Sequence, residues 1–138
     1  MNPQDIERLT SQRLEQAHIA LDDAKFLLDG GRSSQSVVNR SYYAMFYAAL
    51  ALLQSISKAP SKHTGVISLF DTEFAAKGVF SKDLSKDLHR AFELRQTADY
   101  RTMALITPEM ALETWQRAAR FVEAIHRYFE ERRKQTTT

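Results

Sequence analysis

Apolar residues recur every three or four positions along most of the chain, and glycine and proline interrupt the recurrence. This spacing places apolar side chains on one face of an α-helix, and we find no segment that is typical of a strand. The four glycines and three prolines fall almost entirely at the breaks between segments. The pattern therefore predicts helices at about 3–29, 34–56, 63–77, 82–100 and 108–133, followed by a disordered tail at 134–138.

Segment 34–56 differs from the others because it is apolar nearly all round after Arg40. Such a pattern is typical of a helix that is surrounded by other helices. Small residues follow steps of three and four along it: Ser41, Ala44, Ala48 and Ala51. They predict a groove into which a neighbouring helix packs closely. Four long helices, one short helix and short loops together predict an all-α fold, an antiparallel up-and-down four-helix bundle with an additional short helix.

Length and composition limit the possible classes of protein. A chain of 138 residues with 43% hydrophobic content suits a single domain over 1–138. Without cysteine it can form neither disulfides nor a thiolate zinc site, and its four histidines are too scattered for a recognisable metal motif, so we predict no metal and no cofactor. We expect no signal peptide, no membrane span and a cytoplasmic location.

The charge of the chain decides little about its function. Nineteen basic and 17 acidic residues give a formal net charge of +2, and they are interspersed along the sequence. A nucleic-acid-binding protein commonly concentrates its basic residues on one face or helix. Composition therefore indicates no nucleic-acid-binding stripe, and evidence for a site must come from the spacing of particular residues.

One candidate site lies on the second predicted helix. Arg40, Tyr43 and Tyr47 follow steps of three and four, so they share a face on which a cation and two phenolic hydroxyls line one wall. The alternative interpretation is structural. Tyrosine rings often fill a core while their hydroxyls reach the surface of the bundle.

A second candidate lies at the end of segment 82–100. Its apolar stripe contains Leu84, Leu88 and Phe92, and the same steps continue onto Arg95 and then Asp99. Burying an arginine on a core-facing stripe is costly unless it forms an ion pair, and Asp99 can supply the carboxylate for one. The pair therefore indicates either a functional site or a salt bridge that fixes the end of the helix. Tyr100 and Arg101 follow directly and bring a phenol and a second cation to the same place.

These segments resemble one known family. The resemblance rests on four stretches: NRSYYAMFYAALALL at 39–53, SKHTGVISLF at 61–70, ELRQTADYR at 93–101 and AARFVEAIHRYF at 118–129. In this order they resemble the HEPN family over roughly 7–129, with the small stand-alone prokaryotic HEPN proteins as the nearest branch.

The resemblance implies an all-α bundle, a homodimer, and pairing with a minimal nucleotidyltransferase in a toxin–antitoxin module. Many HEPN proteins are metal-independent ribonucleases with an arginine, four to six further residues and then a histidine. Arg95 matches the arginine of that motif, but after four intervening residues Tyr100 stands where a histidine is expected. Since tyrosine is a poor base at neutral pH, Tyr100 does not easily replace it.

Three functions follow from these observations. We predict a module that binds a nucleotide, RNA or a partner protein through seven residues: Arg40, Tyr43, Tyr47, Arg95, Asp99, Tyr100 and Arg101. One alternative is a metal-independent endoribonuclease toxin, in which Arg95 stabilises the phosphate charge and Tyr100 or the loop histidine His63 transfers protons. Another alternative is a purely structural assembly protein.

Overall fold

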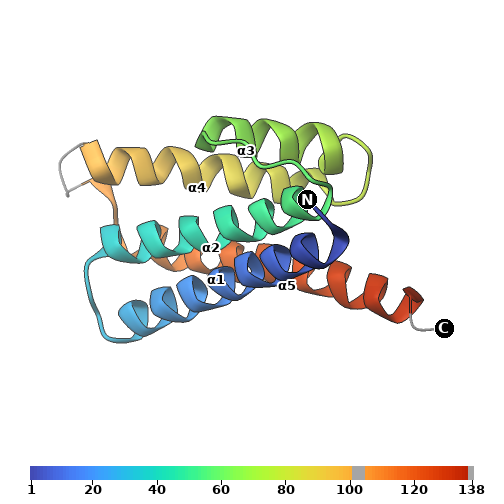
Figure 1. Cartoon of the computed structure of the whole chain (residues 1–138). Helices are drawn as coiled ribbons and strands as arrows, with labels where there is room; N and C mark the ends of the chain where they lie inside the picture. Colours follow the sequence, from blue (N-terminus) through green and yellow to red (C-terminus); the bar gives the residue numbers. More distant parts are fainter. Residues whose placement is uncertain (101–104, 137–138) are drawn as a thin grey trace.

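The computed structural model describes the backbone of residues 1–100 and 105–136, and the side chains of 1–98 and 105–135. Its elements, in chain order, are the α-helices α1 (Pro3–Asp29), α2 (Ser34–Ser55) and α3 (His63–Phe70), the π-helical turn η1 (Asp71–Ala75), and the α-helices α4 (Lys82–Tyr100) and α5 (Pro108–Thr136). No β-strand occurs within the described ranges. The predicted all-α fold is confirmed (Figure 1).

Two helix boundaries differ from the prediction. The third segment is not one helix over 63–77, because α3 ends at Phe70 and the chain continues as η1, where Ala76 N–H donates to Asp71 O at 2.7 Å. The last helix reaches Thr136, so residues 134–136 are helical although the prediction assigns them to the tail. Arg133 and Lys134 lie in its last turn, where positive charge stabilises the negative end of the helix dipole.

Side-chain capping explains where α2 and α5 begin. The N–H of Ser36 donates to Ser33 Oγ at 3.2 Å at the start of α2, and that of Met110 donates to Thr107 Oγ1 at 3.1 Å at the start of α5. Each cap satisfies a backbone donor that the helix leaves open, typically worth about 1 kcal/mol. Between α1 and α2 the chain turns through Gly31, whose φ of 66° is one that a side chain disfavours.

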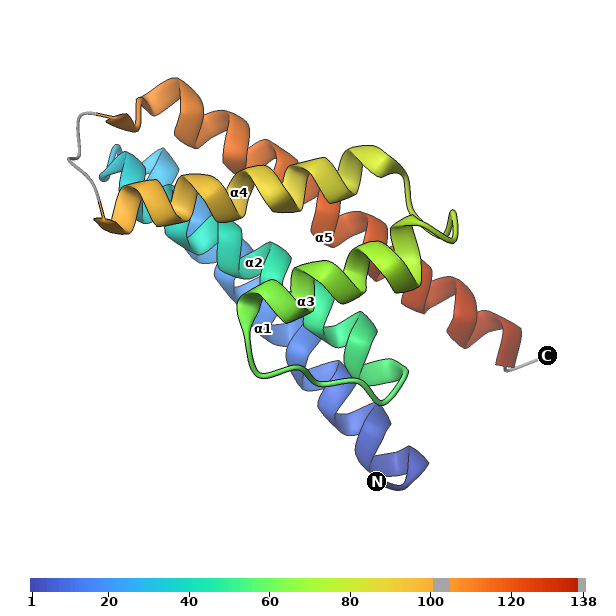
Figure 2. The same cartoon turned by 90° about the horizontal axis from the view of Figure 1, so that it is seen from above.

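Helix α2 lies at the centre of the molecule and packs against α1, α3, α4 and α5 (Figures 1 and 2). Ala44, Ala48 and Ala51 are completely buried, as the predicted small-residue groove requires. On α1, Ala17 and Ala20 are buried in the same core cluster, so α1 and α2 approach each other over small side chains. The sequence is thus apolar over most of α2 because neighbouring helices bury about half of its residues.

An aromatic cluster attaches α3 and η1 to the bundle. Phe70 is fully buried at the end of α3, and its ring centroid lies 5.3 Å from that of Phe121 on α5 and 6.2 Å from that of Phe74 on η1. Phe80, in the loop before α4, stacks on Phe70 at 6.0 Å. The short helix is therefore anchored at its C-terminal end, with its N-terminal His63 directed toward α2.

No helix in the described part of the chain combines the length with the sustained apolar character that a membrane-spanning helix needs.

Candidate functional site

One wall of the candidate site is built by α2. The guanidinium carbon of Arg40 lies 5.1 Å from the ring centroid of Tyr43, and the Tyr43 and Tyr47 rings are 5.9 Å apart. Arg40 Nε and Nη2 both donate to Asn39 Oδ1, each at 3.2 Å, which holds the guanidinium along the helix. Arg40, Tyr43 and Tyr47 are each half-buried, so part of this wall remains exposed.

Helix α4 adds a second guanidinium to this wall. Arg95 Cζ lies 5.4 Å from the ring centroid of Tyr43 and 5.7 Å from that of Tyr42. A cation over an aromatic face gains about 0.5–1 kcal/mol at an exposed site and more when it is desolvated. Arg40 and Arg95 come from different helices yet converge on the Tyr43 ring, so two guanidinium groups lie beside one aromatic ring.

His63 begins α3 and lies beside the same tyrosine wall, with its ring centroid 5.8 Å from that of Tyr43. Its Nδ1 lies 2.7 Å from the hydroxyl oxygen of Tyr42, and its ring stacks on Phe46 with centroids 4.3 Å apart and an interplanar angle of 17°. Because Phe46 supports the face of the imidazole and Tyr42 holds one nitrogen, the orientation of the ring is fixed by two contacts.

The protonation of this pair follows from its surroundings. Partial burial, assisted by the nearby Arg95, lowers the pKa of His63, so the imidazole is neutral at neutral pH. Burial raises the pKa of the Tyr42 phenol despite the opposing effect of Arg95, so the hydroxyl keeps its proton. Tyr42 O–H can then donate to His63 Nδ1, which leaves the imidazole proton on Nε2.

The structure therefore brings together five of the residues selected from the sequence: Arg40, Tyr43, Tyr47, His63 and Arg95. The side chains of the other three, Asp99, Tyr100 and Arg101, lie outside the described residues, so their roles stay predictions. Sequence reasoning missed Tyr42 and Phe46. Nothing in helical spacing identifies Tyr42, because its importance comes from a histidine that is 21 positions away in the chain.

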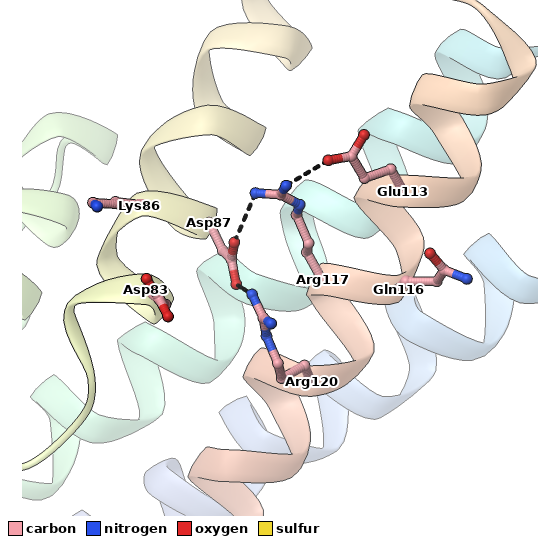
Figure 3. A pocket seen from close by; sticks show the side chains of 7 residues that line it. All are labelled: Asp83, Lys86, Asp87, Glu113, Gln116, Arg117 and Arg120. Atoms are coloured by element: carbon pink, nitrogen blue, oxygen red, sulfur yellow. Dashed lines mark hydrogen bonds and ion pairs between the residues drawn. The ribbon is translucent and has the colours of Figure 1, made fainter.

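A separate cluster of charges joins α4 to α5 (Figure 3). Asp87 on α4 is only 2% exposed, and its carboxylate accepts from Arg117 Nη1 at 3.1 Å and from Arg120 Nη2. Arg117 also donates to Glu113. The interaction with Asp87 raises the pKa of Arg120. A signal for this cluster exists in the sequence, since Asp87 interrupts the stripe formed by its apolar neighbours on α4.

This cluster is better suited to fixing two helices than to binding a ligand. It borders a pocket of about 380 Å³ that three acidic and three basic residues line: Asp83, Asp87, Glu113, Lys86, Arg117 and Arg120. Their formal charges cancel, and both arginines are already used by Asp87. Among the described residues, moreover, no three His, Asp or Glu side chains lie close enough to hold one metal ion.

The helical fold agrees with the comparisons to known proteins. The HEPN domain family matches residues 10–131, so the chain belongs to the HEPN family, as the resemblance predicted. A "UPF0332 protein" of Thermotoga maritima is 38% identical over 125 residues, which cover 91% of this chain and 94% of the relative.

Two further relatives carry names that refer to toxins, and both come from Methanocaldococcus jannaschii. The protein named "Putative toxin MJ0605" is 32% identical over 127 residues, covering 92% of this chain and 93% of its own length. The protein named "Putative toxin MJ0142" is 39% identical over 74 residues, which are 54% of this chain and 50% of the relative. The chain is thus similar over almost its whole length to a protein with a toxin name.

Proposed function

We propose that this protein is the toxin-like, RNA-binding component of a toxin–antitoxin pair, that it acts in the cytoplasm as a homodimer, and that its partner is a minimal nucleotidyltransferase. The observation that carries RNA binding is the convergence of Arg40 and Arg95 on the ring of Tyr43. Membership in the HEPN family and the toxin names of two relatives support the toxin-like role.

The chemistry of the site matches a single-stranded RNA segment. A guanidinium can donate two parallel hydrogen bonds to a phosphate, and tyrosine rings can stack on bases. With its proton on Nε2, His63 can donate a further hydrogen bond to a phosphate oxygen. In this protonation state neither His63 nor the protonated Tyr42 is a free base, so the arrangement favours binding over cleavage.

Arg95→Ala and Arg40→Ala should each weaken binding of a fluorescently labelled single-stranded RNA by roughly tenfold or more, since a hydrogen bond to a charged group is worth about 1.5–3 kcal/mol. Fluorescence anisotropy titration at constant salt measures this, because phosphate binding depends strongly on ionic strength.

Arg90→Ala is the matched control for this experiment. Arg90 lies on the same helix as Arg95 but lines a different pocket, together with Met110 and Thr114 of α5. Removing it changes the net charge equally while leaving the site intact. Equal affinities for Arg90→Ala and Arg95→Ala would show that only the overall charge matters and would refute the proposed site.

A metal-independent ribonuclease is the second candidate, because His63 and Arg95 both contact the ring of Tyr42. Cleavage would require the other arrangement of the same hydrogen bond, in which His63 Nδ1–H donates to the Tyr42 oxygen. His63 Nε2 would then be free to accept the proton of a 2′-hydroxyl, while Arg95 stabilised the charge on the phosphate.

Cleavage is tested by incubating total cellular RNA with the purified protein in excess chelator. If the protein is a nuclease, wild type and Arg90→Ala should degrade the RNA, whereas His63→Ala and Arg95→Ala should leave it intact. RNA that stays intact with all four proteins would exclude turnover and leave RNA binding as the function to be tested.

A further inference from the structure

A small pocket continues from the candidate site toward the beginning of α2. It has a volume of about 380 Å³ and is lined by Leu27, Gln35, Ser36, Asn39, Arg40 and Ala98. These residues come from the end of α1, the first turns of α2 and the last described turn of α4. Since Arg40 belongs both to this pocket and to the wall with Tyr43, a ligand on Arg40 reaches the pocket without leaving the site.

The neutral polar side chains of this pocket each use one polar group for a hydrogen bond within the protein and keep a second group available. Asn39 uses its Oδ1 for Arg40, which leaves its amide N–H groups as donors. Gln35 Nε2 donates to the carbonyl oxygen of Ala98 at 2.7 Å, which leaves Oε1 as an acceptor. Neither remaining group takes part in another hydrogen bond among the described residues.

Ser36 contributes in the same way. Its Oγ accepts from Ser33 Oγ at 2.7 Å, so its own hydroxyl proton remains available for donation. The pocket thus offers amide donors, a hydroxyl donor and an amide acceptor, and each is anchored within the protein. Because the anchors fix the orientation of the side chains, little rotamer entropy is lost when a ligand binds.

We propose that this pocket binds one unpaired nucleobase of the RNA, next to a phosphate bound by Arg40 and Arg95, and that it gives the site a base preference. The inference rests on the proposed function and adds specificity to it. The edge of every base carries donors and acceptors side by side, and asparagine and glutamine amides are suited to pairing with them.

The composition of the pocket favours a base over a second phosphate. Among the residues that the structure describes, Arg40 is the charged residue of its lining, and the other polar side chains are neutral. A phosphate would gain more from additional cations, whereas a neutral ring with polar edges can use amides and a hydroxyl. Leu27 and Ala98 supply the apolar surface that the face of such a ring requires.

The test compares four six-nucleotide RNAs, each of one base, by anisotropy titration. Wild type should bind the preferred one roughly tenfold more tightly than the least preferred one, because matched hydrogen bonds to a base discriminate by about 1–3 kcal/mol. Asn39→Asp keeps the oxygen that Arg40 uses but exchanges the amide donor for an acceptor, so it should abolish or reorder the preference. Ser36→Ala, a milder change, should reduce it.

Gln16→Glu provides the matched control. Gln16 Oε1 accepts from Arg13 Nη1 at 3.0 Å on α1, so this variant adds one negative charge beside an arginine, as Asn39→Asp does, but away from the pocket. It should leave the order of the four affinities unchanged. Arg95→Ala should weaken all four by a similar factor, because a phosphate contact carries no information about the base.

The outcomes separate this inference from the function on which it rests. If wild type binds all four RNAs equally, or if Asn39→Asp and Ser36→Ala both preserve the wild-type order and spread of affinities, the base pocket is refuted while RNA binding stands. If the protein binds none of the four RNAs at any concentration tested, both the pocket and the proposed function are refuted.

Discussion

Replacing both arginines that hold Asp87, in the variant Arg117→Ala/Arg120→Ala, should lower the free energy of unfolding by about 3–5 kcal/mol. The carboxylate is 2% exposed and would keep its place in the helix interface without its two partners. Burial of an unpaired charge is among the costliest changes in a protein. Urea denaturation followed by circular dichroism measures the difference.

A rescue experiment identifies the cause of this loss. Adding Asp87→Asn to the double variant removes the buried charge, so the triple variant should recover part of the lost stability. Arg127→Ala is the control, because Arg127 pairs with Glu123 on the exposed face of α5 at 2.9 Å and should cost less than about 1 kcal/mol. A double variant that is as stable as this control would contradict the role we assign to Asp87.

Phe70→Ala should have an effect of similar size, about 3–5 kcal/mol, because it removes a large, fully buried side chain. The loss combines the transfer free energy of the ring with the free-energy cost of a cavity. Three neighbouring aromatic rings, those of Phe74, Phe80 and Phe121, cannot fill this cavity without moving. Guanidinium denaturation midpoints at constant m-value report the change in stability.

Phe70→Leu retains most of the buried volume and should cost clearly less than Phe70→Ala. Val79→Ala removes a nearby apolar side chain that is 44% exposed, so it should change stability by only about 0.5 kcal/mol. If Phe70→Ala and Val79→Ala shift the midpoint equally, Phe70 does not anchor α3.

Most of the helical fold could be predicted from the sequence because local sequence signals mark the helices. Caps such as Ser33 and Thr107 mark two beginnings, and helical spacing defines the apolar faces. The division of α3 from η1 could not be predicted, because the π-helical turn changes the hydrogen-bond partner by one residue without any Gly or Pro to mark it. The extension of α5 into 134–136 was missed because polar residues at the end of a helix carry no periodic signal.

The candidate site was predictable only in part. Arg40, Tyr43 and Tyr47 lie on one helix, where regular geometry fixes their neighbourhood. The convergence of Arg95 and His63 on Tyr42 depends on how three helices pack, and a single helix cannot define that packing. Packing also determines the partners of Asp87, which lie 30 and 33 positions further along the chain, so the interrupted stripe on α4 alone could not identify them.

The central position of α2 has a consequence for hydrogen exchange. Because four helices cover α2, its backbone amides should exchange with deuterium only during global unfolding, whereas the short α3 can open locally at lower cost. Arg40, Tyr42 and Tyr43 therefore lie on α2, which we expect to open least often, while His63 begins α3, which we expect to unfold locally more often. A bound ligand would contact one helix, α2, that stays folded and one, α3, that opens locally. Binding should therefore slow amide exchange in α3, and this slowing would report occupancy of the site.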